Sequence, residues 1–189
     1  LEEPVDTMYV YGDVRLSDLA AWPDTVVRYI GASGKAFRLE GYLVITETGR
    51  LTISEDVLNV GDPVYDGKYW IQVNGSLVVN GSVILGTDPE DGTWGGIRIQ
   101  PYGNLSVNAS SLSGADPLVL IHDPRADLEE RIKFNNTRLE AKGTALKIAD
   151  LTGGMAGVVK QNRTLALGAP HPLNNMELTV GDGPALYMQ

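Results

Sequence analysis

Two histidines are the first residues that could take part in acid–base chemistry. Asp123 follows His122 directly after an apolar segment, so a carboxylate could orient this imidazole as a general base. His171 lies between two prolines and has no evident partner. A histidine just past a strand is also a common bend residue, and neither spacing matches a Ser-His-Asp triad or a zinc site. We therefore predict no catalytic residue.

Two acidic segments, "TDPEDG" (87–92) and "HDPRADLEER" (122–131), could bind a hard cation. The carboxylates of Asp88, Glu90 and Asp91 are oxygen ligands of the kind that calcium prefers. Their spacing matches no EF-hand loop, and solvated acidic loops are common. We expect no cofactor, with Ca²⁺ at these three residues as the alternative.

The most frequent motif that carries chemistry is the N-glycosylation acceptor Asn-x-Ser/Thr. Ten Asn and twenty-one Ser or Thr would give about one such triplet by chance, but the chain has six. The acceptors are Asn74, Asn80, Asn104, Asn108, Asn135 and Asn162. Such a site implies exposure in a secreted protein. Asn-Gly-Ser and Asn-Ala-Ser also suit β-bends, so a purely structural role stays open.

The overall composition excludes several classes of function. The chain has 189 residues with 15 Lys and Arg against 24 Asp and Glu, a formal net charge of −9. No basic stripe is present, which argues against a nucleic-acid partner. No run of about 18 apolar residues is present, so we expect no membrane span. The absence of cysteine excludes disulfides and thiolate chemistry but not an extracytoplasmic location.

A repeat positions these candidate residues. Three segments follow one template, Gly-polar-Leu-x-Val/Ile: "GRLTISEDVLNVG" from Gly49, "GSLVVNGSVILG" from Gly75 and "GNLSVNASSLSG" from Gly103. The starts are 26 and 28 residues apart. A period in the twenties indicates stacked coils, each of which buries its apolar face against its neighbours.

Short alternations between the glycines indicate strands rather than helices. We expect an all-β fold, a parallel β-helix of six or seven coils. Inward side chains would stack one coil apart, and the aligned glycines would occupy the bends. The predicted inward residues are Leu51, Ile53, Leu77, Val79, Leu105 and Val107. Asn80 and Asn108 share a template position and could form an amide ladder. The alternative is a β-sandwich with hairpins at the Asn-Gly pairs 74–75 and 80–81.

Residues 1–35 differ from the repeat and are predicted to form an N-terminal cap, which leaves 36–189 as the β-helix. "RLSDLAAWPD" (15–24) could hold a short helical turn with Ser17 or Asp18 as its N-cap, ending before Pro23. The last residues, "PALYMQ", remain apolar, so we expect this chain to be a fragment of a longer protein.

Three segments resemble the right-handed β-helix proteins of the pectate-lyase-like superfamily: "WIQVNGSLVVNGSVILG", "WGGIRIQPYGNLSVNASSLSGA" and "IKFNNTRLEAKGTALKIA". The likeness covers about residues 40–165 and is greatest to the non-catalytic surface proteins of archaea and bacteria in that group. The resemblance implies the fold more strongly than the function, because this superfamily also contains polysaccharide lyases and hydrolases.

"RIK" at Arg131–Lys133 resembles one motif of the polygalacturonases, whose companion motifs are missing here. Without paired carboxylates no general acid stands opposite a base. We instead expect a strand with outward Arg131 and Lys133 around a buried Ile132, and no enzymatic activity.

These observations favour a structural or interaction module of a secreted or cell-surface glycoprotein, such as an adhesin-like or surface-layer segment. Its partners would be other surface proteins, polysaccharide, or further copies stacked end to end. The alternative is a domain that binds or cleaves polysaccharide, with exposed aromatic rings stacking on sugars. The aromatic candidates are Tyr65, Tyr69, Trp70, Trp94 and Tyr102.

Overall fold

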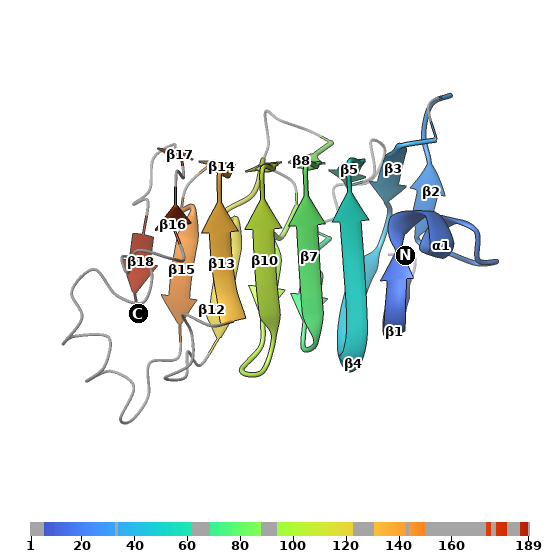
Figure 1. Ribbon diagram of the computed structural model, residues 1–189, viewed down its shortest axis with the longest axis horizontal. Coiled ribbons are helices and arrows are strands. Elements are labelled where there is room, and N and C mark those ends of the chain that lie inside the picture. Colours follow the sequence, from blue (N-terminus) through green and yellow to red (C-terminus); the bar gives the residue numbers. More distant parts are fainter. Residues whose placement is uncertain are drawn as a thin grey trace, which may run out of the picture.

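The computed structural model is an all-β protein. Its strands lie side by side, across the long axis of the molecule, and follow one another along that axis (Figure 1). It describes residues 6–32, 34–61, 69–87, 94–122, 131–142, 144–149, 173–174, 177–180 and 186–188. The elements are β1 Thr7–Arg15, α1 Leu16–Ala20, β2 Val27–Tyr29, β3 Ala36–Leu39, β4 Tyr42–Ser54, β5 Val57–Val60, β6 Ile71–Val73, β7 Ser76–Asn80, β8 Val83–Gly86, β9 Ile97–Ile99, β10 Asn104–Asn108, β11 Ser111–Ser113, β12 Val119–His122, β13 Ile132–Asn135, β14 Arg138–Ala141, β15 Leu146–Ala149, β16 Leu173–Asn174, β17 Glu177–Val180 and β18 Leu186–Met188.

The strands form three columns. Column 1 contains the second half of β4 followed by β7, β10, β13 and β16. Column 2 contains β3, β5, β8, β11, β14 and β17, with β2 at its edge. Column 3 contains the first half of β4 followed by β6, β9, β12, β15 and β18. The chain passes from column 3 to column 1 to column 2 and back, so each column gains one strand per passage.

The pairing between these strands is parallel. Among the described residues, only β2 and β3 pair antiparallel. The prediction of an all-β fold is confirmed. The hairpins of the alternative sandwich are not formed at Asn74–Gly75 or Asn80–Gly81, because the strands on either side of each pair belong to different columns.

The predicted inward residues line the core. The register places Leu77 between Leu51 and Leu105, and the next inward row joins Ile53, Val79 and Val107 in the same way. All six side chains are buried. Burial of each contributes roughly 1.5–3 kcal/mol, so the alternation within each strand stabilises the stack directly.

Three aligned glycines lie at the corner where the chain passes from column 3 to column 1, as predicted. A Cβ at Gly49 would overlap the carbonyl oxygen of Val10, and one at Gly75 would overlap those of Thr46 and Gly49. At Gly103 the overlap would be with the carbonyl of Val73. The reason for glycine here is therefore close approach of backbone from the neighbouring passage.

The N-terminal residues lie at one end of the columns (Figure 1). Strand β1 pairs in parallel with β4, and α1 buries Leu16 and Leu19 in the core. The predicted helical turn is present and ends before Pro23. Its predicted N-cap is wrong: Arg15 is the N-cap, and its backbone N–H donates to the Asp18 carboxylate at 2.8 Å. Strand β1 runs directly into the helix, so the carboxylate reaches back from the first turn.

Candidate functional site

Two corners of the structure bring together the residues singled out in the sequence. The first corner is the turn from column 1 to column 2, at residues 55–56, 81–82, 109–110 and 136–137. The second corner is the bend from column 3 to column 1, at residues 46–49, 74–75 and 100–103.

At the first corner, three predicted acceptor triplets form the same turn. Each middle residue has a positive φ: 57° at Gly81, 48° at Ala109 and 49° at Asn136. This left-handed conformation costs little for glycine and asparagine and about 1–2 kcal/mol for alanine. Since the turn recurs in each passage, the triplet has a structural reason to recur with it.

The hydroxyl groups of these triplets are buried. The exposed fraction is 2% for Ser82, 6% for Ser110 and 1% for Thr137. Each hydroxyl lies within hydrogen-bond distance of the carbonyl of the Asn two residues before it, at 2.8, 2.7 and 3.0 Å respectively. The hydroxyl thereby closes its own turn.

The same hydroxyls join successive turns. The backbone N–H of Ser82 donates to Ser110 Oγ at 3.1 Å, and that of Asp56 donates to Ser82 Oγ at 3.2 Å. Thr137 Oγ1 lies 3.1 Å from the carbonyl of Val107 in the passage before it. A buried N–H left without its acceptor costs about 1–3 kcal/mol, so these side chains hold the first corner together.

The acceptor amides lie in one row. The register pairs Asn80 with Asn108, as expected from their shared template position, and it also pairs Asn108 with Asn135. Asn135 Nδ2 donates to Asn108 Oδ1 at 2.8 Å. This amide ladder joins Asn108 to Asn135, whereas the predicted pair is Asn80 and Asn108.

The first turn of the row departs from the pattern, with Ser54-Glu55-Asp56 in place of Asn-x-Ser. The backbone N–H of Ser54 donates to Asp56 Oδ2 at 3.2 Å. Burial raises the pKa of Asp56, partly offset by this hydrogen bond. Glu55 is solvent-exposed, and its hydrogen bond with Lys35, at 2.7 Å, lowers the Glu55 pKa and raises that of Lys35.

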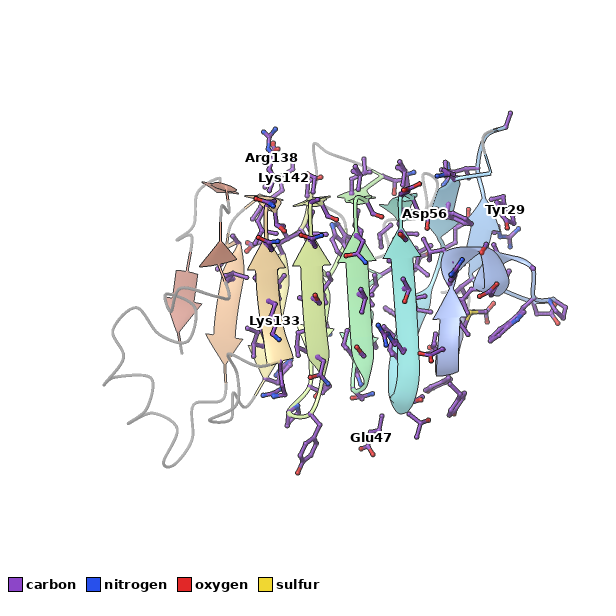
Figure 2. All side chains as sticks on the ribbon, viewed as in Figure 1. Tyr29, Glu47, Asp56, Lys133, Arg138 and Lys142 are labelled. Atoms are coloured by element: carbon purple, nitrogen blue, oxygen red, sulfur yellow. The ribbon has the colours of Figure 1, made fainter. Side chains whose placement is uncertain are left out.

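The second corner carries a hollow of about 370 Å³ on the outer surface. The residues lining it are Glu47, Thr48, Gly49, Asn74, Gly75, Ser76, Tyr102 and Asn104. Tyr102 is 62% exposed, and Asn104 Nδ2 donates to the Tyr102 carbonyl at 3.3 Å. Figure 2 shows Glu47 extending outward where β4 bends between its two halves, at this corner. The corner thus brings together three predicted residues: two glycosylation candidates and one aromatic sugar-contact candidate.

Two other aromatic candidates are not available to a sugar. Trp94 is 1% exposed, and its indole N–H donates to the Ser113 carbonyl at 2.8 Å. Tyr69 is also buried and packs edge-on against Tyr42. The prediction that these two rings are exposed for stacking is wrong, because both fill space between passages of the chain.

Trp70 is half-buried on the outer side of column 3. Its ring stacks on Tyr42 at 4.6 Å between centroids, and the Arg98 guanidinium lies 5.0 Å from the Trp70 centroid. Burial lowers the pKa of Arg98, although an arginine in such a site stays charged at neutral pH. The cation and the second ring occupy the neighbourhood of the indole. Among the described aromatic candidates, Tyr102 has the most exposed ring.

The orientation of the side chains in the "RIK" motif differs in one residue from the prediction. Ile132 is buried and Lys133 is exposed, as predicted. Arg131 is not outward: it is buried, and its Nη1 donates to the Gly103 carbonyl at 2.8 Å. His122 is half-buried at the end of β12.

The remaining candidates lie outside the described residues: Tyr65, Asp88, Glu90, Asp91, Asp123, Asn162 and His171. Within the described residues, no three His, Asp or Glu side chains gather as a metal site. Nor does that part of the chain contain a helix long and apolar enough to cross a membrane.

No family model, curated protein or solved structure matches this chain.

Proposed function

We propose that the three columns are the sheets of a right-handed parallel β-helix, and that this protein is a structural or interaction module of a secreted or cell-surface glycoprotein. The observation that carries the proposal is the in-register stacking of like residues, core over core and turn over turn, along one axis. Such a stack is a rigid spacer that presents rows of side chains at fixed intervals of about 4.8 Å.

The outer surface of the middle passages supports a passive scaffold. In residues 69–87 and 94–122, Arg98 and Asp116 are the only Lys, Arg, Asp or Glu. The outward positions of β7, β10 and β11 carry mainly hydroxyl and amide groups. This neutral polar surface hydrates well and suits a segment that separates or displays other parts of a surface protein.

We propose that residues 1–35 cap one end of the stack, with α1 covering the inward rows. The three columns end at β16, β17 and β18 on the other side. Strand edges there would accept the strands of a second copy. Light scattering at increasing concentration tests the second copy: a mass that rises with concentration supports it, and a constant monomer mass contradicts it.

Labelling of intact cells that make the protein tests the proposed location at the cell surface. Lys35 and Lys133 are exposed and would react with a membrane-impermeant amine reagent. We expect both lysines to be labelled before lysis, while a cytoplasmic protein in the same sample is not. Labelling that requires lysis would overturn the proposed location.

Binding of an external polysaccharide is the second candidate function, favoured by the exposed Tyr102 ring beside the amides of Asn74 and Asn104 in the hollow. A glycan array screened with wild-type protein and with Tyr102→Ala tests it. Binding that the substitution removes supports this second function, and no retained glycan on either protein contradicts it. Release of reducing ends from polymer substrates would contradict our view that the module is not an enzyme.

A further inference from the structure

Four of the five described acceptor triplets fall into two structural classes. In the first-corner triplets the Ser or Thr is buried and hydrogen-bonded, as at Ser82, Ser110 and Thr137. In the triplet Asn104-Leu105-Ser106, the Asn and Ser share the outer face of β10. Among the described acceptors, Asn104 is the one whose side chain is exposed, while Asn74, Asn80, Asn108 and Asn135 are half-buried.

A glycan at the first corner would disturb existing contacts. The amide of Asn135 already donates to Asn108. The three amides of this row stand about 4.8 Å apart, the spacing of neighbouring strands. Glycans on adjacent members would crowd one another, and rotating an amide outward to make room would break the ladder.

A glycan at Asn104 would meet open space instead. Asn104 Nδ2 makes only long hydrogen bonds, of 3.3 Å to the Tyr102 carbonyl and 3.5 Å to the Gly75 carbonyl. One amide N–H remains after glycosylation and can keep one of these bonds. The hollow beside it, about 370 Å³ in volume, lies at the lower end of the range of small-molecule pockets, about 300–1,000 Å³.

The exposed Tyr102 ring gives this hollow an apolar wall two residues before the acceptor. The C–H face of a pyranose can pack on such a ring. Asn74 and Glu47 line the same hollow and offer an amide and a carboxylate to sugar hydroxyls.

We propose that Asn104 carries the N-glycan of this part of the protein and that its first sugar residue packs on Tyr102. This inference deepens the proposed function and assumes its secretory route. In the transfer, Asn104 Nδ2 bonds to C1 of a lipid-diphosphate-linked oligosaccharide as the C1–O bond to phosphate breaks. The lipid diphosphate leaves, and the nitrogen gives up one proton to a base of the transferase.

The transfer precedes folding of β10, because Leu105 within the triplet is buried in the folded protein. The folded structure then selects among glycosylated chains: a glycan at Asn104 lies away from the first corner, whereas a glycan at Asn80, Asn108 or Asn135 would crowd the row of amides that contains the Asn135–Asn108 hydrogen bond.

Site occupancy tests the acceptor. The whole chain is secreted from cells that perform N-glycosylation, and glycopeptides are mapped by mass after enzymatic release in ¹⁸O-water. We expect Asn104 to be occupied and the three first-corner sites to be unmodified. Ser106→Ala should remove the glycan, while Ser111→Ala, a matched outward serine outside any triplet, should not. An unmodified Asn104, or folded protein with glycans at the first corner, would overturn the proposal.

This test is independent of the proposed location. Native protein without glycan, together with recombinant protein modified at Asn104, would contradict the secretory address and leave the site assignment standing.

Thermal unfolding tests the contact with Tyr102. Tyr102→Ala is compared in the glycosylated protein and in the unglycosylated Ser106→Ala background. We expect the substitution to lower Tm by about 2–4 °C more in the glycosylated protein, with Tyr102→Phe restoring the difference. Equal shifts in both backgrounds would show that the ring supports only the polypeptide and would overturn the sugar contact.

Discussion

The two corners of this protein solve the same problem, turning the chain between columns, in different ways. Each described turn of the first corner has two residues between its strands, and its contacts are made by hydroxyl side chains and left-handed backbone. At the second corner the described linking segments are 74–75 and 100–103, so their lengths vary. Its glycines lie so close to backbone carbonyls of the neighbouring passage that a Cβ would overlap them.

This difference separates two roles of small residues. At the second corner the absence of a Cβ allows two backbones to approach. At the first corner the turn has room for a side chain, as Ala109 and Asn136 show, and the buried hydroxyl carries the specificity. The linking segments can vary in length at the second corner, because no repeated network of side chains spans it. The hollow forms at this corner.

The largest predicted effect is that of Gly75→Ala. The new methyl group would overlap the carbonyl oxygens of Thr46 and Gly49, which belong to the backbone and cannot move aside as a side chain can. We expect a loss of about 3 kcal/mol or more in the free energy of unfolding, measured by urea titration. A loss below about 1 kcal/mol would mean that the second corner is not closely packed.

Removing one hydroxyl from the first corner should cost less. Ser110→Ala deletes the acceptor of the Ser82 N–H and the donor to the Asn108 carbonyl, both in a buried turn. We expect a loss of about 1–3 kcal/mol in urea titration. In protein made without glycans, Ser106→Ala, a half-buried outward serine in the neighbouring strand, is the matched control and should change stability by less than about 0.5 kcal/mol. Equal effects would remove the special role of the first corner.

The irregular first turn, Ser54-Glu55-Asp56, should make the free energy of unfolding depend on pH. Burial raises the pKa of Asp56 in the folded state, so its protonated form favours folding. This contribution is fully present below the usual aspartate pKa of about 3.9 and is lost as pH rises through the raised folded value.

Asp56→Ser places a serine where the regular turns have Ser or Thr. The free energy of unfolding of this variant, relative to that of the wild type, should therefore increase as the pH rises from acid to neutral. Urea titrations of both proteins across that range measure the difference, with Glu55→Gln as the control for the neighbouring carboxylate. The pKa of Glu55 is lowered by Lys35, so loss of that carboxylate acts with the opposite sign. A difference between the wild type and Asp56→Ser that is constant with pH would contradict this explanation.

The smallest predicted effect is that of Gly81→Ala at the first corner. Gly81 has a positive φ, but the nearest atom to an added Cβ is Glu55 Cγ at 3.9 Å. The cost is then only that of the left-handed backbone, about 1 kcal/mol, and Gly81→Asn should cost less because asparagine tolerates this conformation. A loss as large as that of Gly75→Ala would erase the contrast between the corners.

The sequence predicts the regular parts of this fold because one period controls them. Inward Leu and Val recur every 26 to 28 residues, and the alignment of Asn80 with Asn108 follows from the same spacing. The burial of the hydroxyls was not predicted. A signal was available, because Ser82, Ser110 and Thr137 recur with the period of the core residues, whereas solvated residues need not.

The irregular parts could not be predicted from that period. Trp94 lies between β8 and β9. Its burial depends on the carbonyl of Ser113, at the end of β11, which accepts the hydrogen bond of its indole N–H. Arg131 is buried because the Gly103 carbonyl of an earlier passage accepts its hydrogen bond. Such contacts depend on which passages become neighbours, information that a local pattern of polar and apolar residues does not contain.

The most direct test uses the absence of native cysteines to place pairs of nitroxide labels. Val78 and Ser106 are outward neighbours in parallel strands, about 4.8 Å apart in strand spacing. Ser76 and Leu85 would instead face each other in a hairpin with its turn at Asn80–Gly81. Stacked passages predict strong dipolar broadening of the electron paramagnetic resonance spectrum for Val78→Cys/Ser106→Cys and little for Ser76→Cys/Leu85→Cys. The reverse result would contradict the stacked arrangement.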